Sequence, residues 1–176
     1  MALGAQVTFV TGPATEARPA GAKIIEVQTA AEMLTAVNQN LPADAAIFAA
    51  AVADWRMAEA ETSKLKKSKK GLPVLSFAEN PDILASVAQL KSGRPSLVVG
   101  FAAETDDVEA NATAKRERKG CDWIVANDVS PETGIMGGTE NAVTLISETG
   151  AEDWPRMAKD AVAKRLAERI ATALNS

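Results

Sequence analysis

The segment SLVVGFAAETDDVEANATAKRERKGCDWIVAND, residues 96–128, decides the fold class because it places a charged helical pattern between two apolar runs. Residues 96–104 and 122–128 have the nearly continuous apolar character of strands that are buried on both faces of a sheet. Residues 106–120, between them, are predicted to form a helix. A strand, a helix and a strand joined by short connections predict the parallel unit of an α/β sheet.

The same alternation continues in both directions. Thr29 and Glu32 form a capping-box pattern at the start of a predicted helix at 29–41. The run AAIFAAAVA (45–53) is apolar on both faces, which predicts a central parallel strand. The other expected elements are strands at 6–12, 23–27, 73–79 and 141–147, a helix at 81–90 with Asn80 as N-cap and Pro81 in its first turn, and a final helix at about 157–173 with Val162, Leu166 and Ile170 on one face.

These elements predict a Rossmann-like, doubly wound α/β fold with a mostly parallel sheet in a three-layer αβα arrangement. The 176 residues contain no repeat and no linker, so one domain spanning residues 1–176 is expected. Gly4 directly precedes a strand and resembles the glycine that follows a helix. We therefore expect that a helix, and a strand before it, belong upstream of this position.

Composition excludes several classes of protein. A hydrophobic content of 47% and a net charge of −4 predict a folded protein and argue against a general nucleic-acid binder. No apolar run approaches the roughly 20 residues of a membrane span. The N-terminus has neither the basic region nor the cleavage site of a signal peptide, and the single cysteine, Cys121, cannot form an internal disulfide, so a cytoplasmic location is expected.

The chain has no histidine and no tyrosine. Ser-His-Asp and Cys-His nucleophile pairs and histidine metal sites are therefore impossible within it. Any chemistry must use lysine, carboxylate, amide and backbone groups, together with a hard metal ion bound by oxygen atoms.

Polar residues follow four of the predicted strands. Because ligands of open α/β sheets bind outside the carboxyl ends of the strands, we expect these residues to converge on one rim. They are Thr11-Gly12-Pro13, Asp54, Glu104-Thr105 and Asn127-Asp128.

Five lysines lie within residues 64–70, shortly after Asp54. A solvated surface loop is one explanation of this charge run. The alternative is a site for a strongly anionic ligand, because a carboxylate beside flexible ammonium groups suits a magnesium-bound triphosphate. The sequence pattern leaves both explanations open.

Several ordered motifs identify a family. The segments AAAVADWR (49–56) with KLKK (64–67), ENPDIL (79–84), VVGFAAET (98–105) and KRERKGCDWIVAND (115–128) resemble the phosphopantothenate–cysteine ligase domain. In bacteria this domain is commonly the C-terminal half of a bifunctional coenzyme A biosynthesis protein, and the resemblance covers nearly the whole chain.

The resemblance implies a two-step ligase. The carboxylate of 4′-phosphopantothenate attacks the α-phosphate of CTP to give an acyl-cytidylate and pyrophosphate, and the amino group of cysteine then displaces CMP. It also implies Mg²⁺ and a homodimer. FMN is expected only in the decarboxylase domain of the full-length protein, which these residues do not include. The family's first strand, its glycine-rich turn and a segment with an essential asparagine precede GAQVTF, so we expect CTP binding by this chain but little amide formation.

The resemblance also assigns roles to individual residues. Asp54 is expected to bind Mg²⁺ and CTP, and Lys64 to contact phosphate, both as catalytic residues. Lys66 and Lys67 are expected in a flap over the substrate, and Lys69 and Lys70 in solvent. The expected nucleotide-binding residues are Asn80, Pro81, Asp82, Ile83, Phe101, Lys115 and Lys119, with Gly100 allowing close approach beside Phe101; Ala50, Ala51 and Asn127 are expected at the substrate.

Each of these residues also has a purely structural explanation. A strand-end aspartate such as Asp54 can cap the next turn, and Asn80 can be a plain N-cap. Phe101 can be a core residue, and Lys115 and Lys119 can serve the C-terminal end of a helix. Cys121 is expected to be a small packing residue.

Two functional alternatives remain. A nicotinamide-binding Rossmann oxidoreductase is the rival at the level of the fold, but no G-x-G-x-x-G follows any predicted strand. A fragment that binds nucleotide without completing the reaction is the second.

Overall fold

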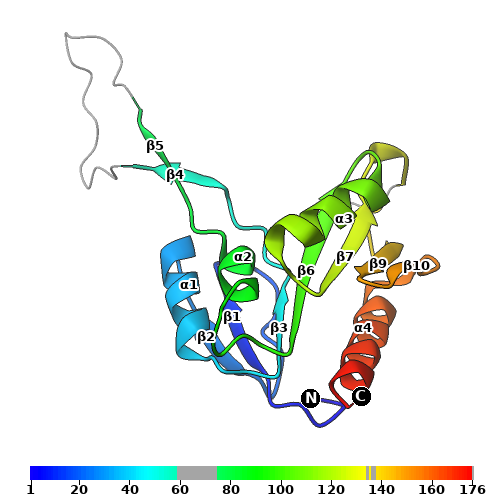
Figure 1. The fold of residues 1–176 in the computed structure, drawn as a ribbon, viewed down its shortest axis with the longest axis horizontal. Coiled ribbons are helices and arrows are strands. Elements are labelled where there is room, and N and C mark those ends of the chain that lie inside the picture. Colours follow the sequence, from blue (N-terminus) through cyan, green and yellow to red (C-terminus); the bar gives the residue numbers. More distant parts are fainter. Residues whose placement is uncertain (59–74, 134, 136–137, 176) are drawn as a thin grey trace.

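The computed structural model describes residues 1–58, 75–133, 135 and 138–175 (Figure 1). Its main element is a five-stranded sheet with the strand order β10-β9-β7-β6-β3. Strands β3, β6 and β7 are parallel, and β9 and β10 are antiparallel to their neighbours. The bounds are β3 Ala45–Phe48, β6 Leu97–Glu104, β7 Trp123–Asp128, β9 Val143–Ser147 and β10 Gly150–Asp153.

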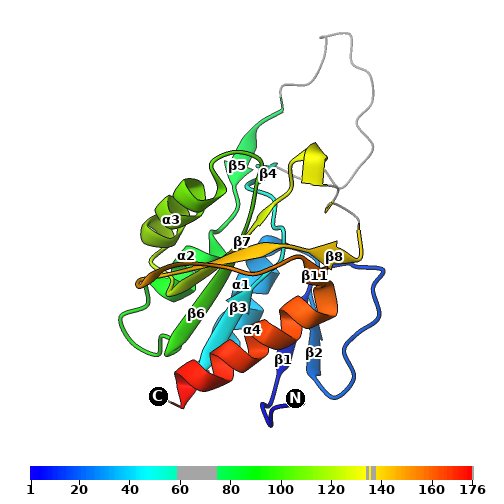
Figure 2. The same ribbon diagram turned by 90° about the vertical axis from the view of Figure 1, so that its right-hand side faces the viewer.

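Helices cover both faces of this sheet, as the three-layer prediction requires (Figures 1 and 2). On one face α2 (Ile83–Ala88) and α3 (Val108–Lys119) pack on a buried cluster that includes Val98, Ala102 and Ile124. On the other face α4 (Lys159–Leu174) places Val162, Leu166 and Ile170 on a second cluster. The predicted face of the last helix is therefore confirmed.

Helix α1 (Ala30–Gln39) begins where the sequence predicts. The Thr29 hydroxyl accepts the Glu32 N–H at 3.1 Å, and the Glu32 carboxylate accepts the Thr29 N–H at 3.2 Å. This reciprocal pair satisfies two of the N–H groups that a helix N-terminus leaves without partners.

The strand predicted at 45–53 is parallel to its neighbour, as expected, but it is shorter than predicted and is not central in the sheet. Within this run the strand is Ala45–Phe48, its one partner among the strands that the structure describes is β6, and the Ile47 side chain is 52% exposed. Strands β1 (Thr8–Thr11) and β2 (Lys23–Glu26) form a separate parallel pair instead of extending the sheet beside β3. Among the described strands β3 is therefore an edge of the sheet. An apolar run indicates burial, but it does not indicate which strands become hydrogen-bonded neighbours.

A two-stranded antiparallel ribbon projects from the body (Figure 1). It consists of β4 (Trp55–Met57) and β5 (Phe77–Glu79), with Trp55 opposite Glu79. Strand β5 corresponds to the end of the strand predicted at 73–79, and β4 was not predicted. The remaining elements are β8 Glu140–Asn141, β11 Met157–Ala158, which pairs with β8, and a 3-10 helix at Pro131–Thr133.

Helix α2 starts later than predicted. Its N-cap is Asp82, whose carboxylate accepts the Ala85 N–H at 3.0 Å, so neither Asn80 nor Pro81 belongs to the helix. Gly4 has the positive φ expected of a glycine after a helix, but it closes a turn in which its N–H donates to the Met1 carbonyl at 2.9 Å. None of the helices in the described part of the chain has the length and apolar character needed to cross a membrane.

Candidate functional site

The root of the β4–β5 ribbon brings Asp54 and Asn80 together. The Asn80 backbone N–H donates to the Asp54 carbonyl at 2.8 Å, and the Asn80 side-chain amide donates to the Ala53 carbonyl at 2.8 Å. The Arg56 guanidinium donates to the Glu79 carbonyl across the same pair of strands. Among the described residues we find no hydrogen bond or ion pair to the exposed Asp54 carboxylate.

An ion pair joins two further predicted residues. The Lys119 ammonium, in the last turn of α3, donates to the carboxylate of Asp82 at the N-cap of α2. Burial by itself would raise the pKa of Asp82. The hydrogen bonds from Lys119 and the Ala85 N–H, with the positive charges of Lys119 and Arg118, outweigh it and hold that pKa below its ordinary value.

The carboxyl ends of β6 and β7 lie side by side. Glu104 pairs with Asp128 and Ala103 with Asn127, and the Val129 N–H donates to the Glu104 carbonyl at 2.9 Å. Hydrogen bonds from Ser130 hold the pKa of Asp128 below its ordinary value. Two of the four predicted strand ends thus form one rim. Thr11 belongs to the separate β1–β2 pair, and Asp54 lies at the ribbon root.

The structure does not bring Phe101 to the Asp82–Lys119 pair. Phe101 packs on the cluster beneath α4, whereas Leu84 of α2 and Val108 of α3 pack on the opposite face of the sheet. The expectation that Gly100 leaves room for a nucleotide is wrong. A Cβ atom at Gly100 would lie 2.7 Å from the Leu84 side chain and 2.8 Å from that of Ile124, so the space is filled by α2 and β7.

The other predicted residues are placed as follows. Ala50 and Ala51 are exposed after β3, Pro81 and Lys115 are half-buried, and Ile83 is buried in α2. Lys64, Lys66, Lys67, Lys69 and Lys70 lie outside the described residues. Cys121 is buried beside Ile124, which agrees with a packing role, and burial raises the pKa of its thiol.

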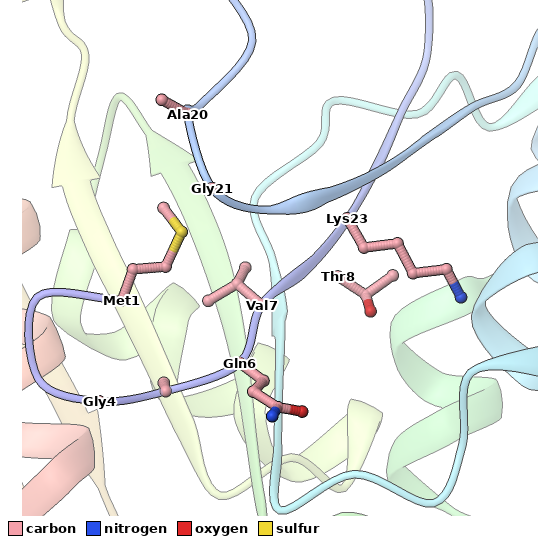
Figure 3. A pocket seen from close by; sticks show the side chains of 9 residues that line it. Met1, Gly4, Gln6, Val7, Thr8, Ala20, Gly21 and Lys23 are labelled. Carbon is pink, nitrogen blue, oxygen red and sulfur yellow. The ribbon is translucent and has the colours of Figure 1, made fainter.

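One pocket of about 500 Å³ lies at the amino ends of β1 and β2 (Figure 3). Met1, Gly4, Val7 and Lys23 are among the residues that line it. It contains none of the predicted site residues. Among residues 1–58, 75–133, 135 and 138–175, no group of three histidine, cysteine or acidic side chains could hold a metal ion by itself.

Sequence reasoning missed two features of this region. Arg56 lies in one of the family motifs, and the sequence predicted no role for it, although its guanidinium stabilises the ribbon root. Asp82 and Lys119 were predicted separately, and no local signal could pair residues that are 37 positions apart.

Comparison with known proteins identifies the family. The sequence matches the DNA/pantothenate metabolism flavoprotein C-terminal domain over residues 1–174. The chain belongs to this family. It is 42% identical over 170 residues to the coenzyme A biosynthesis bifunctional protein CoaBC of Vibrio cholerae, and 41% identical over 172 residues to the protein of that name from Escherichia coli.

These matches cover 96% of this chain and 42% of each relative, so the chain spans less than half the length of the curated relatives it matches. The fold agrees with the same family. A crystal structure of the C-terminal domain of CoaBC superimposes with a TM-score of 0.77 at 31% identity, covering 99% of this chain and 77% of that one. A second member, from Streptococcus pneumoniae, shares the fold with a TM-score of 0.75 at 19% identity, covering 97% of this chain and 82% of that one.

Proposed function

We propose that this chain belongs to the phosphopantothenate–cysteine ligase domain of a coenzyme A biosynthesis protein and binds CTP as the activating nucleotide. The observation that carries the proposal is the match of residues 1–174 to the family, at about 40% identity to the C-terminal half of CoaBC relatives. The arrangement of charged groups supports the proposal. Asp54 is next to Asn80 and Lys119 is next to Asp82, so a carboxylate and an ammonium group lie near the two ends of the short segment 80–82 that leads into α2.

The proposed chemistry needs no histidine base. The pantothenate carboxylate is already ionised at neutral pH, so activation requires alignment with the α-phosphate and neutralisation of the triphosphate charge. Lys64, Lys115 and Lys119 would supply that positive charge. The Lys119 ammonium already pairs with one anionic group, the Asp82 carboxylate, and it could also donate to an oxygen of the triphosphate.

The residues present fit a magnesium ion that is shared with the nucleotide. Mg²⁺ is usually bound through one or two carboxylates, with substrate phosphates and water completing its shell. Asp54 offers one exposed carboxylate, which suits this mode, whereas the described residues offer no cluster for an all-protein site. The ion would contribute charge neutralisation at the phosphates.

Ala50, Ala51 and Asn127 remain the proposed contacts of the pantothenate arm. The exposure of both alanines after β3 leaves their backbone accessible. A nucleotide contact of the Phe101 side chain has no support from its position beneath α4.

Calorimetric titration tests the proposal. We expect Mg²⁺-CTP to bind more tightly than Mg²⁺-ATP or NADH, and product formation to require phosphopantothenate, cysteine and CTP together. Turnover is measured with this chain and with the chain extended by the segment that precedes it in relatives. Equal affinity for all nucleotides, with no amide product from either protein, would refute the ligase proposal.

A further inference from the structure

We propose that Asn80 is a positioning residue that holds the Asp54 segment in place for metal-bound nucleotide, a role that rests on the proposed function. Asn80 was expected to cap a helix or to touch the nucleotide itself. The structure instead directs two of its N–H donors to the carbonyls of two consecutive residues, Ala53 and Asp54, both at 2.8 Å.

The first of these bonds continues the ribbon. Trp55 is opposite Glu79 in the β4–β5 pairing, so the bond from the Asn80 backbone to the Asp54 carbonyl continues the antiparallel pairing beyond its last registered pair. The side-chain bond to Ala53 then extends the connection past the end of the strand. The carbonyl groups before and after the Asp54 side chain are thereby both bonded to Asn80, the residue that follows β5.

The other side of Asn80 is attached to the body of the protein. Pro81 follows with a fixed φ angle, Asp82 caps α2, and Ile83 is only 6% exposed. The Asp82 carboxylate also pairs with Lys119 of α3. Asn80 therefore joins the Asp54 segment to α2 and, through the Asp82–Lys119 pair, to α3, which carries the proposed contacts Lys115 and Lys119.

This connection matters because the rest of the ribbon is weakly anchored. An isolated two-stranded ribbon is marginally stable in water, and the ribbon carries three large exposed side chains, Trp55, Met57 and Phe77. Without the Asn80 side chain, the bond to the Ala53 carbonyl is lost, and the remaining bonds at the ribbon root hold the Asp54 carboxylate less firmly relative to the Lys119 ammonium. A ligand that must meet both groups would then have to order the segment itself, which lowers its affinity.

The side chain has to be asparagine or a close mimic. Aspartate has the same shape but no N–H donor, and it would place a negative charge against the Ala53 carbonyl. Alanine removes the bond without adding charge. Asn111 provides a matched control, because its side-chain amide donates to the Asp106 carbonyl at the same 2.8 Å on the exposed side of α3.

A double-mutant cycle with Mg²⁺-CTP tests the inference. We expect Asn80→Ala to weaken binding about tenfold and Asn111→Ala to leave it unchanged. We further expect Asp54→Asn to weaken binding much less in the Asn80→Ala background than in the unaltered chain, because a carboxylate that is not held in place contributes less. Fully additive effects, or equal effects of the two alanine variants, would overturn the proposal.

Amide hydrogen exchange keeps this test independent of the ligase assignment. Asn80→Ala should accelerate exchange in residues 55–57 and 77–79 several-fold, whereas Asn111→Ala should not. If the unaltered chain binds no Mg²⁺-CTP, the proposed function fails on that result alone. If exchange in the ribbon is the same with and without the Asn80 side chain, the positioning role fails even when binding is observed.

Discussion

Lys119 and Asp82 are 37 residues apart in the sequence and form an ion pair between the last turn of α3 and the N-cap of α2. The Lys119 side chain is 20% exposed and that of Asp82 is 45% exposed, so the pair is partly screened by solvent. The same carboxylate caps α2 through the Ala85 N–H. One carboxylate therefore fixes the start of one helix and the end of another.

We expect this ion pair to make the stability of the folded protein depend on pH in the acidic range. The pKa of Asp82 in the folded state is below its ordinary value of 3.8, so the stabilisation is present above that value and is lost as the pH falls through the folded pKa. Asp82→Asn keeps an N-cap side chain but removes the charge. The difference in melting temperature between the two proteins should be largest near pH 7 and should shrink below about pH 4.

Glu140→Gln provides the control for this pH series. Glu140 pairs with Arg156, and both side chains are 52% exposed, so removing this pair should change the melting temperature little at any pH. A difference between Asp82→Asn and the unaltered chain that stays constant from pH 7 to pH 3 would contradict the assigned role of the ion pair.

Gly100→Ala should destabilise the protein by about 1–3 kcal/mol, as is typical when extra methyl groups are forced into a packed core. The added Cβ would lie 2.7 Å from Leu84 and 2.8 Å from Ile124, whose side chains are confined within the core under α2. Gly12→Ala is the matched control, because a Cβ at Gly12 meets nothing within 4 Å. Urea unfolding measures both variants, and equal stabilities would show that α2 can move away without cost.

Arg94→Ala should cost about 2–3 kcal/mol, as expected for losing several hydrogen bonds that include a charged acceptor. The guanidinium donates to both Asp122 oxygens at 3.0 and 2.9 Å and to the Ala88 carbonyl at 2.7 Å. It thus connects α2 to the start of β7. Lys164→Ala is the control, since Lys164 is 79% exposed and its contact with Glu168 is 4.0 Å long. Similar unfolding free energies for the two variants would contradict this role.

Lys64→Gln should weaken Mg²⁺-CTP binding by about 1.5–3 kcal/mol, whereas Lys70→Gln should change it little, because a charge-assisted contact is lost only in the first. Both lysines lie outside the described residues, so this prediction comes from the charge pattern and the family resemblance. Titration calorimetry at one ionic strength measures both. Equally small effects would favour a solvated loop.

The homodimer implied by the family resemblance stays a prediction, and the ribbon offers a surface on which to test it. Trp55, Met57 and Phe77 are 59%, 40% and 63% exposed, and the strand register puts them on one face. We expect light scattering to show a dimer in the micromolar range and Phe77→Ser to shift it toward monomer, because burying such a side chain favours association. A monomer at every concentration would contradict the prediction for this chain.

The sequence by itself determined the elements that depend on near neighbours. The capping box of Thr29 and Glu32, the buried strands β6 and β7 with α3 between them, and the inward face of α4 were all predicted from spacing within about fifteen residues. These features follow from rotamer, capping and burial preferences that act locally. Two of the family motifs, at 98–105 and 115–128, lie in these stretches, and the family match confirmed the resemblance that the motifs suggested.

Only the tertiary structure decided which of these elements meet. Strand alternation puts the side chains of Phe101 and Ala102 on opposite faces of the sheet. Only the packing of α2 and α4 shows that the Phe101 face is the one beneath α4. An apolar run at 45–53 predicted burial on both faces, yet among the described strands β3 pairs with β6 alone and forms an edge of the sheet. The contacts of Asn80 with Ala53 and of Lys119 with Asp82 join residues 27 and 37 positions apart. Such contacts depend on how the whole chain is brought together, and no local preference encodes them.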